Sequence, residues 1–170
     1  APPTAVKMVN GRVTVNIRAD YAGPVLLKVV DTSAGTDYLN EVDGKAIDLS
    51  SDLRAIVQVT AGQATKPITI SPLTELVVQI AMGDNGGDNG TSGNKMSATT
   101  TSASIAAADK KVADALGLPP GLSETDVQTT IDATGAASTQ PTSGGQVLAA
   151  ISGLEKADGT TTSSALATLK

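Results

Sequence analysis

The chain has no cysteine, no histidine, no tryptophan and no phenylalanine among its 170 residues. Without histidine there is no Ser-His-Asp triad, and without cysteine there is no thiolate nucleophile, disulfide or cysteine-ligated metal centre. Only carboxylate, lysine, tyrosine or hydroxyl chemistry remains open to a catalytic site. We therefore expect a protein that is not an enzyme, with no catalytic residues and no cofactor.

Aromatic side chains are almost absent, since the chain has only two tyrosines. A hydrophobic core must therefore be built from Val, Leu, Ile, Met and Ala, each of which contributes about 1.5–3 kcal/mol at most when fully buried. A chain of this length still buries roughly 70% of the surface that its unfolded form exposes. The composition thus favours one domain with closely packed, small side chains.

Basic residues are outnumbered, with 12 Lys and Arg against 17 Asp and Glu and a net charge of -5. Phosphate binding needs clustered Lys and Arg, so we expect no nucleic-acid partner and no anionic membrane partner. No apolar run approaches the ~20 residues of a membrane span, so we expect no direct membrane insertion. We also expect the chain to be a monomer. The opening Ala1-Pro2-Pro3, with no Met and no charged leader, predicts a piece excised from a longer chain.

Residues 1–70 show the short apolar runs and turn residues that are typical of strands. Asn10-Gly11 separates two alternating runs and predicts a two-residue hairpin turn. We predict a small antiparallel, sandwich-like (Ig-like) part of about five to seven strands, in which the strand from Val25 to Val30 is central and buried on both faces. The predicted strands cover residues 6–9, 13–17, 25–30, 38–39, 46–47, 55–59 and 68–70.

Residues 71–170 change to helical periodicity, so the predicted fold class is α+β, with four or five helices after the strands. Ser71 and Pro72 predict the start of the first helix, in which Leu73 faces the core, Thr74 is exposed and Gly83 ends the helix. Three further predicted helices cover residues 102–116, 123–135 and 145–156. A short last helix is predicted to begin near residue 163. We expect the two parts, 1–70 and 71–170, to form one composite module.

A polar, glycine-rich loop over residues 83–101 interrupts the helical part. Its Asp and Asn spacing suggests calcium, with Asp84 and Asp88 as candidate ligands, because hard cations need several oxygen ligands from a tight loop. The spacing does not match an EF-hand, and no Glu closes the loop. A flexible linker is the favoured interpretation, and an inserted domain or a metal site are the alternatives.

Three other features of the sequence are candidate sites. Asp31-Thr32-Ser33 is similar to the Asp-Thr-Gly of aspartic peptidases, but Asp132-Ala133-Thr134-Gly135 does not supply the second loop that such an enzyme needs. Asp43, Asp48 and Asp52 form a local acidic cluster around Gly44, which is typical of a solvated loop. Tyr38 offers a surface on which a sugar can stack, although a lone Tyr is more typical of packing at a sheet edge.

The order of several short motifs resembles the modules of very large, repetitive bacterial surface adhesins of the repeats-in-toxin type. The motifs are Ala22-Gly23-Pro24-Val25-Leu26-Leu27, Thr36-Asp37-Tyr38-Leu39-Asn40-Glu41-Val42-Asp43-Gly44, Asp52-Leu53-Arg54-Ala55-Ile56-Val57, Ile70-Ser71-Pro72-Leu73-Thr74-Glu75-Leu76, Ile105-Ala106-Ala107-Ala108 and Val112-Ala113-Asp114-Ala115-Leu116-Gly117-Leu118. In such modules an Ig-like sheet leads into a "Thr-Pro-Leu-Thr" helix, where this chain has Ser71 in place of the first Thr.

The resemblance spans roughly residues 22–118, and more loosely Val147 to Leu169. It implies a non-catalytic structural module on the bacterial cell surface, outside the cell, that extends or supports ligand-binding domains of the same long chain. The loop at 83–101 would then be a place where another domain is inserted. The alternative is an adhesion module that binds a peptide or glycan through its polar loops.

Overall fold

The computed structural model describes residues 13–30, 35–36, 38–49, 51–83, 95–125, 127, 130–131, 134, 136–159 and 161–169. Within these ranges the chain is a small α+β protein whose main sheet has two strands and which has four helices. In chain order the elements are β1 (Gly23–Val29), β2 (Tyr38–Leu39), β3 (Ala46–Ile47), β4 (Leu53–Val59), α1 (Pro72–Met82), α2 (Ser102–Leu116), α3 (Ser143–Asp158) and α4 (Thr162–Leu169).

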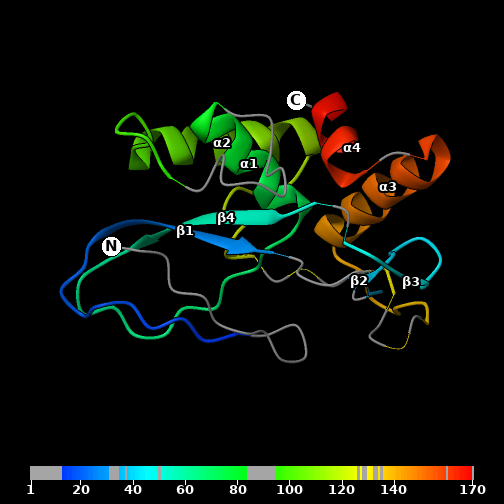
Figure 1. The fold of residues 1–170 in the computed structure, drawn as a ribbon, viewed down its shortest axis with the longest axis horizontal. Helices are drawn as coiled ribbons and strands as arrows, with labels where there is room; N and C mark the ends of the chain where they lie inside the picture. Colours follow the sequence, from blue (N-terminus) through cyan, green and yellow to red (C-terminus); the bar gives the residue numbers. More distant parts are fainter. Residues whose placement is uncertain are drawn as a thin grey trace.

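The main sheet pairs β1 with β4 in antiparallel register, from Gly23 opposite Val59 to Val29 opposite Leu53. Directly opposed residues share a face of the sheet, so Leu26 and Ile56 lie together. Ile56 packs with Val78 of α1 and Ile105 of α2 in one buried cluster, against which Leu26 also packs. Figure 1 shows α1 and α2 on the same side of the sheet. One face of this two-stranded sheet is therefore covered by helices.

The first two helices begin and end where the sequence predicts. Pro72 is the first residue of α1, and Gly83 ends it with a left-handed φ of 69° that suits a residue without a Cβ. At α2 the Thr101 hydroxyl accepts a hydrogen bond from the Ser104 backbone N–H, and Gly117 ends the helix with φ 66°. The predictions for 71–83 and 102–116 are confirmed because their start and stop signals are local.

The helical core is centred on α1. Figure 1 shows α3 and α4 at one end of the molecule, with the β2–β3 hairpin beside α3. Side chains from all four helices, together with two leucines after α2, form one buried apolar cluster. Its members are Leu73, Leu76, Val77, Ala108, Val112, Ala113, Leu118, Leu122, Leu148, Ile151, Ala165 and Leu166. None of the described helices has the length and apolar character needed to cross a membrane.

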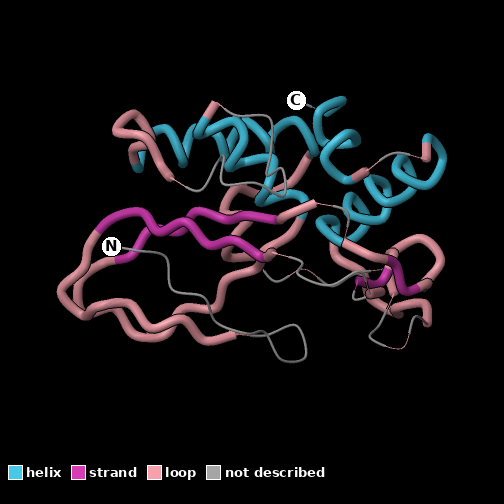
Figure 2. The backbone as a smooth tube through the Cα atoms, viewed as in Figure 1, coloured by secondary structure: helices cyan, strands magenta, loops and turns pink. Residues whose placement is uncertain are grey.

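The predicted Ig-like sandwich is wrong. Val13–Ile17 and Ile68–Ile70 lie outside any strand, and Figure 2 draws the described residues before β1 and the connection from β4 to α1 as loops. Residues 6–9, the other half of the predicted hairpin, lie outside the described residues. Alternating apolar and polar residues indicate a segment that can form a strand, but a strand also needs a neighbouring strand with which to form hydrogen bonds. Val13, Val15 and Ile17 instead remain 39% exposed.

The predicted central strand is also different in the structure. β1 is half-buried along its whole length and pairs only with β4 among the described residues. Its partner β4 is the more buried strand, because α1 packs against it. The short hairpin is confirmed, since Tyr38 pairs with Ile47 and Leu39 with Ala46.

The predicted helix over residues 123–135 is wrong. The described residues here form a turn after Gly121, and Ile131 makes an isolated bridge to Ala137. The Asp109 carboxylate of α2 accepts hydrogen bonds from the backbone N–H groups of Gly121 (2.5 Å) and Leu122 (2.9 Å). This contact from another helix fixes the turn and takes the place of a continuing helical ladder.

Most of the glycine-rich loop, residues 84–94, lies outside the described residues, as do the calcium candidates Asp84 and Asp88. The following segment is described, and Met96 packs against the cluster of Ile56, Val78 and Ile105. The segment therefore contributes an apolar side chain to the protein interior just before α2 begins.

We predict that Leu73→Ala lowers the free energy of unfolding by about 2–5 kcal/mol, because the side chain is 1% exposed and lies in the helical core. Leu154→Ala is the matched control, since this helical leucine is 41% exposed, and it should change stability by less than about 0.5 kcal/mol. Urea unfolding measures both. Equal losses at the two positions would contradict the placement of α1.

Candidate functional site

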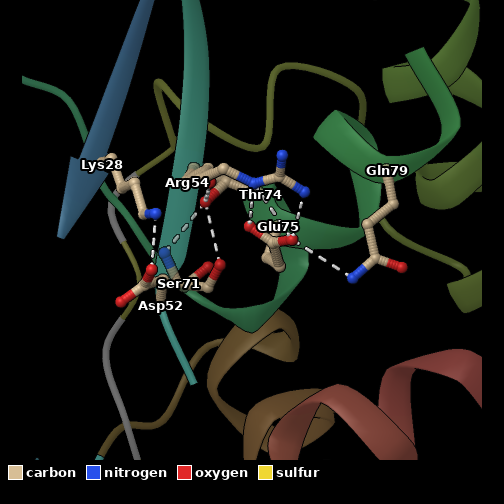
Figure 3. A network of polar contacts seen from close by, with 7 residues as sticks. All are labelled: Lys28, Asp52, Arg54, Ser71, Thr74, Glu75 and Gln79. Atoms are coloured by element: carbon tan, nitrogen blue, oxygen red, sulfur yellow. Dashed lines mark hydrogen bonds and ion pairs between the residues drawn. The ribbon is translucent and has the colours of Figure 1, made fainter. Parts of the chain in front are cut away.

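A fully buried ion pair joins the sheet to the first helix. Arg54 is the second residue of β4 and is 0% exposed, while Glu75 lies in the first turn of α1 and is 2% exposed. The Arg54 Nη2 atom is 2.7 Å from Glu75 Oε1, and its Nε atom is 3.0 Å from Oε2. Figure 3 shows the guanidinium facing both carboxylate oxygens. Because two pairs of atoms are bonded, this geometry fixes both the distance between β4 and α1 and their relative orientation.

The backbone of the same strand is bonded to the same helix. The Thr74 hydroxyl donates to the Arg54 carbonyl oxygen at 2.8 Å and accepts from the Ser71 backbone N–H at 2.9 Å. Thr74 is only 2% exposed, so the prediction that it faces solvent is wrong. The first turn of α1 lies against β4, and its polar side chains therefore satisfy strand and helix-end groups that water cannot reach.

The charges around this pair balance. Lys28 of β1, directly opposite Arg54 in the sheet, lies 2.5 Å from a carboxylate oxygen of Asp52, which is 2% exposed. Gln79, one turn further along α1, donates from Nε2 to Glu75 Oε1 at 3.2 Å. Two cations and two carboxylates thus meet within one buried network, as Figure 3 shows. An uncompensated charge at this depth would shift its pKa or destabilise the fold.

A second polar junction joins the β2–β3 hairpin to α3. Glu41 in the hairpin turn is 6% exposed, and it accepts hydrogen bonds from the Tyr38 hydroxyl and from Ser152 Oγ of α3, the latter at 2.6 Å. The Thr130 hydroxyl donates to the Glu41 carbonyl oxygen at 2.7 Å. The hairpin is therefore bonded to residues that lie 89 and 111 positions away in the sequence.

Charges at this second junction are less well balanced. Burial raises the pKa of the Glu155 carboxyl on α3, and the negative charge of Glu41 raises it further. Burial, followed by the charge of Glu41, raises the pKa of the Tyr38 phenol as well. At the exposed edge, the Lys156 ammonium lowers the pKa of Asp43, to which it is bonded at 2.5 Å.

A cavity of about 170 Å³ lies on the helix-covered face of the sheet. Ile56 and Gln58 of β4 form one wall, and Val77 of α1 and Ile105 of α2 form others. Because alternate residues of a strand share a face, Gln58 lies on the same side of β4 as Arg54. The buried ion pair and the cavity are therefore neighbours along one strand.

The predicted acidic cluster does not form one site. Asp52 is buried beside Lys28, Asp43 binds Lys156 of α3, and Asp48 is exposed. Within the described ranges, no three acidic residues are grouped so that they could hold a metal ion. Tyr38, considered as a sugar-stacking surface, is partly buried and bonded to Glu41.

Two further candidate segments lie outside the part of the chain that the structure describes. These are Asp31-Thr32-Ser33 and, in the segment Asp132-Ala133-Thr134-Gly135, every residue except Thr134.

Sequence reasoning missed both polar junctions. For the first there was a usable signal, because Arg54 interrupts an otherwise apolar run in β4, and a charge in a buried strand needs a partner. For the second there was none. Glu41 and Ser152 are 111 residues apart in the chain, and each stands in an ordinary polar context.

Comparisons of this chain with protein-family models, with curated proteins and with solved structures found no match.

We predict that Glu75→Gln destabilises the protein by about 3–5 kcal/mol, because it leaves the buried Arg54 guanidinium without a counter-charge. Glu124→Gln, which removes the counter-charge of Lys66 in a half-exposed ion pair, is the matched control and should cost less than about 1 kcal/mol. The double variant Arg54→Met/Glu75→Leu should recover most of the loss. Similar urea midpoints for Glu75→Gln and Glu124→Gln would show that water reaches Arg54.

Because the pKa of Glu155 is raised in the fold, we predict that its contribution to stability depends on pH. A carboxyl whose pKa is higher in the folded state contributes stability below its unfolded pKa of about 4.3 and loses it as pH rises through the folded value. Glu155→Gln should therefore be more stable than the parent at about pH 7 and similar to it at about pH 3.5.

Asp43→Asn is the control with the opposite sign, because the pKa of Asp43 is lowered in the fold. Its stabilising contribution is present above the unfolded pKa and lost as pH falls, so the variant should be less stable than the parent at neutral pH. Urea unfolding at both pH values measures the two differences. A Glu155→Gln variant that is less stable at neutral pH would contradict the account.

Proposed function

We propose that this chain is a non-catalytic structural module of a bacterial cell-surface adhesin, located outside the cell, where it holds neighbouring domains of the same long chain in place. The sequence motifs between residues 22 and 118 carry the resemblance. The observation that supports it best is the buried Arg54–Glu75 pair, which fixes the sheet to the first helix at two atoms.

A spacer between domains needs its own parts to move as one body. In this chain β4 and α1 are joined by the ion pair and also by the bond from Thr74 to the Arg54 backbone. A buried ion pair adds little net stability compared with apolar side chains of the same size, but it penalises any arrangement that separates the charges. It therefore favours one fixed orientation of the helix over alternatives of similar energy.

The second junction attaches the β2–β3 hairpin to the helical part in the same way. Glu41 binds Ser152 and Thr130, and Asp43 binds Lys156, so the β2–β3 hairpin is attached to α3 and to the segment before it. The two junctions connect the N-terminal part with the helical part at separate places. Two separated attachments resist both sliding and rotation of one part against the other.

Exchange of the module within its parent protein tests this function. In the bacterium that encodes the chain, residues 1–170 are replaced by an unrelated folded domain of similar size, and adhesion of the cells to their surface is measured. Adhesion should be preserved, because a spacer acts through its length and stiffness. A matched strain in which the same residues are deleted should adhere less well.

Antibodies raised against the chain provide the control for location, and they should label intact cells. Loss of adhesion after the exchange, although the hybrid protein is displayed normally, would contradict a structural role and indicate a binding module. Failure of the antibodies to label intact cells would contradict the proposed location.

A further inference from the structure

Lys28 and Asp52 meet on the helix-covered face of the main sheet. Lys28 of β1 lies opposite Arg54, so Asp52, which immediately precedes β4, is its diagonal neighbour on the same face. Figure 3 shows the Lys28 side chain reaching across to the Asp52 carboxylate. The Lys28 Nζ atom is 2.5 Å from Asp52 Oδ2. The pairing of the two strands therefore holds an amine and a carboxyl group in contact.

The surroundings of this pair differ from those of an exposed ion pair. The Asp52 side chain is 1% exposed and that of Lys28 is 15% exposed. Lys66 and Glu124 form an ion pair at the same distance of 2.5 Å, but their side chains are 30% and 49% exposed. Burial, and not distance, therefore distinguishes the pair of Lys28 and Asp52.

Asp52 has an ion-pair partner but no hydrogen bond. Both of its carboxylate oxygens are buried, and neither accepts a hydrogen bond of normal geometry from the described residues. A buried carboxylate in this state is unfavourable, as is the desolvated ammonium beside it. Joining the two groups as an amide removes both charges. It also removes the like charge that lies opposite Arg54 in the sheet.

The space beside the Asp52 carboxyl group is dry. Ser51, Asp52, Glu75 and Gln79 line a small void that is too narrow to hold a water molecule. Well-oriented groups of one molecule react with effective molarities of about 10⁵–10⁸ M, which is far above the concentration of water itself. Condensation to an amide is therefore favoured here over hydrolysis.

We propose that Lys28 and Asp52 condense into an intramolecular isopeptide bond, which joins β1 covalently to the start of β4. A proton passes from the Lys28 ammonium to the Asp52 carboxylate and gives an amine and a carboxylic acid. The Nζ lone pair attacks Cγ and forms the new N–C bond. One C–O bond of Asp52 then breaks, and the hydroxyl leaves as water with a second proton from Nζ. Nothing is oxidised or reduced, and the step needs no co-reactant.

The test is the intact mass of the whole chain, measured after unfolding. The chain should be lighter than its sequence requires by the mass of one water molecule. Trypsin should release residues 19–45 joined to residues 46–54, because Lys28 no longer offers a cleavage site, and fragmentation should place the link at Asp52 and not at Asp48. This result does not depend on the folding of any variant. It is also independent of the proposed function, because the mass is a property of the chain alone.

Lys28→Arg is the variant that prevents the reaction and keeps the positive charge. A guanidinium stays protonated in proteins and has no amine lone pair to offer, so this variant should have its full sequence mass. Lys156→Arg, in the more exposed pair with Asp43, is the matched control and should still lose one water molecule. Thermal melting verifies that both variants are folded.

Three results would overturn the proposal. The first is a parent chain with its full sequence mass, both when freshly purified and after prolonged storage. The second is a loss of water that persists in Lys28→Arg, because a succinimide at an Asp-Gly pair such as Asp43-Gly44 would then be its source. The third is a joined peptide whose link lies at a residue other than Asp52.

Discussion

The arrangement of this protein depends on how a charged residue is accommodated near the start of a buried strand. Arg54 cannot reach water, so the fold must provide a counter-charge, and the first turn of α1 provides Glu75. The position of α1 on the sheet follows from that contact. Because α1 also forms the centre of the helical core, the placement of the other helices follows from it in turn.

A second consequence concerns the composition of the interior. With two tyrosines and no other aromatic residues, the chain has only small and aliphatic side chains for its core. Such side chains pack in many ways at similar cost, whereas a hydrogen-bonded ion pair has few acceptable geometries. The buried polar network and the Glu41 junction therefore fix the relative orientation of the strands and helices, which apolar packing alone would leave less well determined. The same face of β4 carries Ile56 and Gln58, which line the cavity of about 170 Å³.

Local signals in the sequence predicted the structure well, and signals that depend on distant partners did not. Ser71-Pro72, Gly83 and Gly117 mark helix ends through backbone chemistry that acts within a few residues, and these boundaries agree with the structure. The alternation of Val13–Ile17 marks only a capacity to pair, and the partner that would complete a sandwich is not present among the described strands.

Contacts between distant residues explain the other differences. The turn after Gly121 is fixed by Asp109, which lies on another helix, so the helical pattern of residues 123–135 was misleading. Nothing in the sequence around Glu41 or Ser152 indicates that these two residues are in contact. In contrast, a charged Arg54 in an otherwise apolar strand does indicate a buried partner of opposite charge. The prediction that Thr74 is exposed is wrong for the same reason: a contact with β4, which the sequence of its own helix does not reveal, determines how buried Thr74 is.

The central claim is that the Arg54 side chain is buried and bonded to Glu75, and solvent exchange of the arginine Nε–H proton measured by ¹⁵N NMR tests it most directly. Arg18, whose side chain is 82% exposed in a pair with Asp20, is the internal reference. The account predicts that the Arg54 Nε–H exchanges far more slowly than that of Arg18, and that this protection is lost in the Glu75→Gln variant. Exchange of the Arg54 proton as fast as that of Arg18 would contradict it.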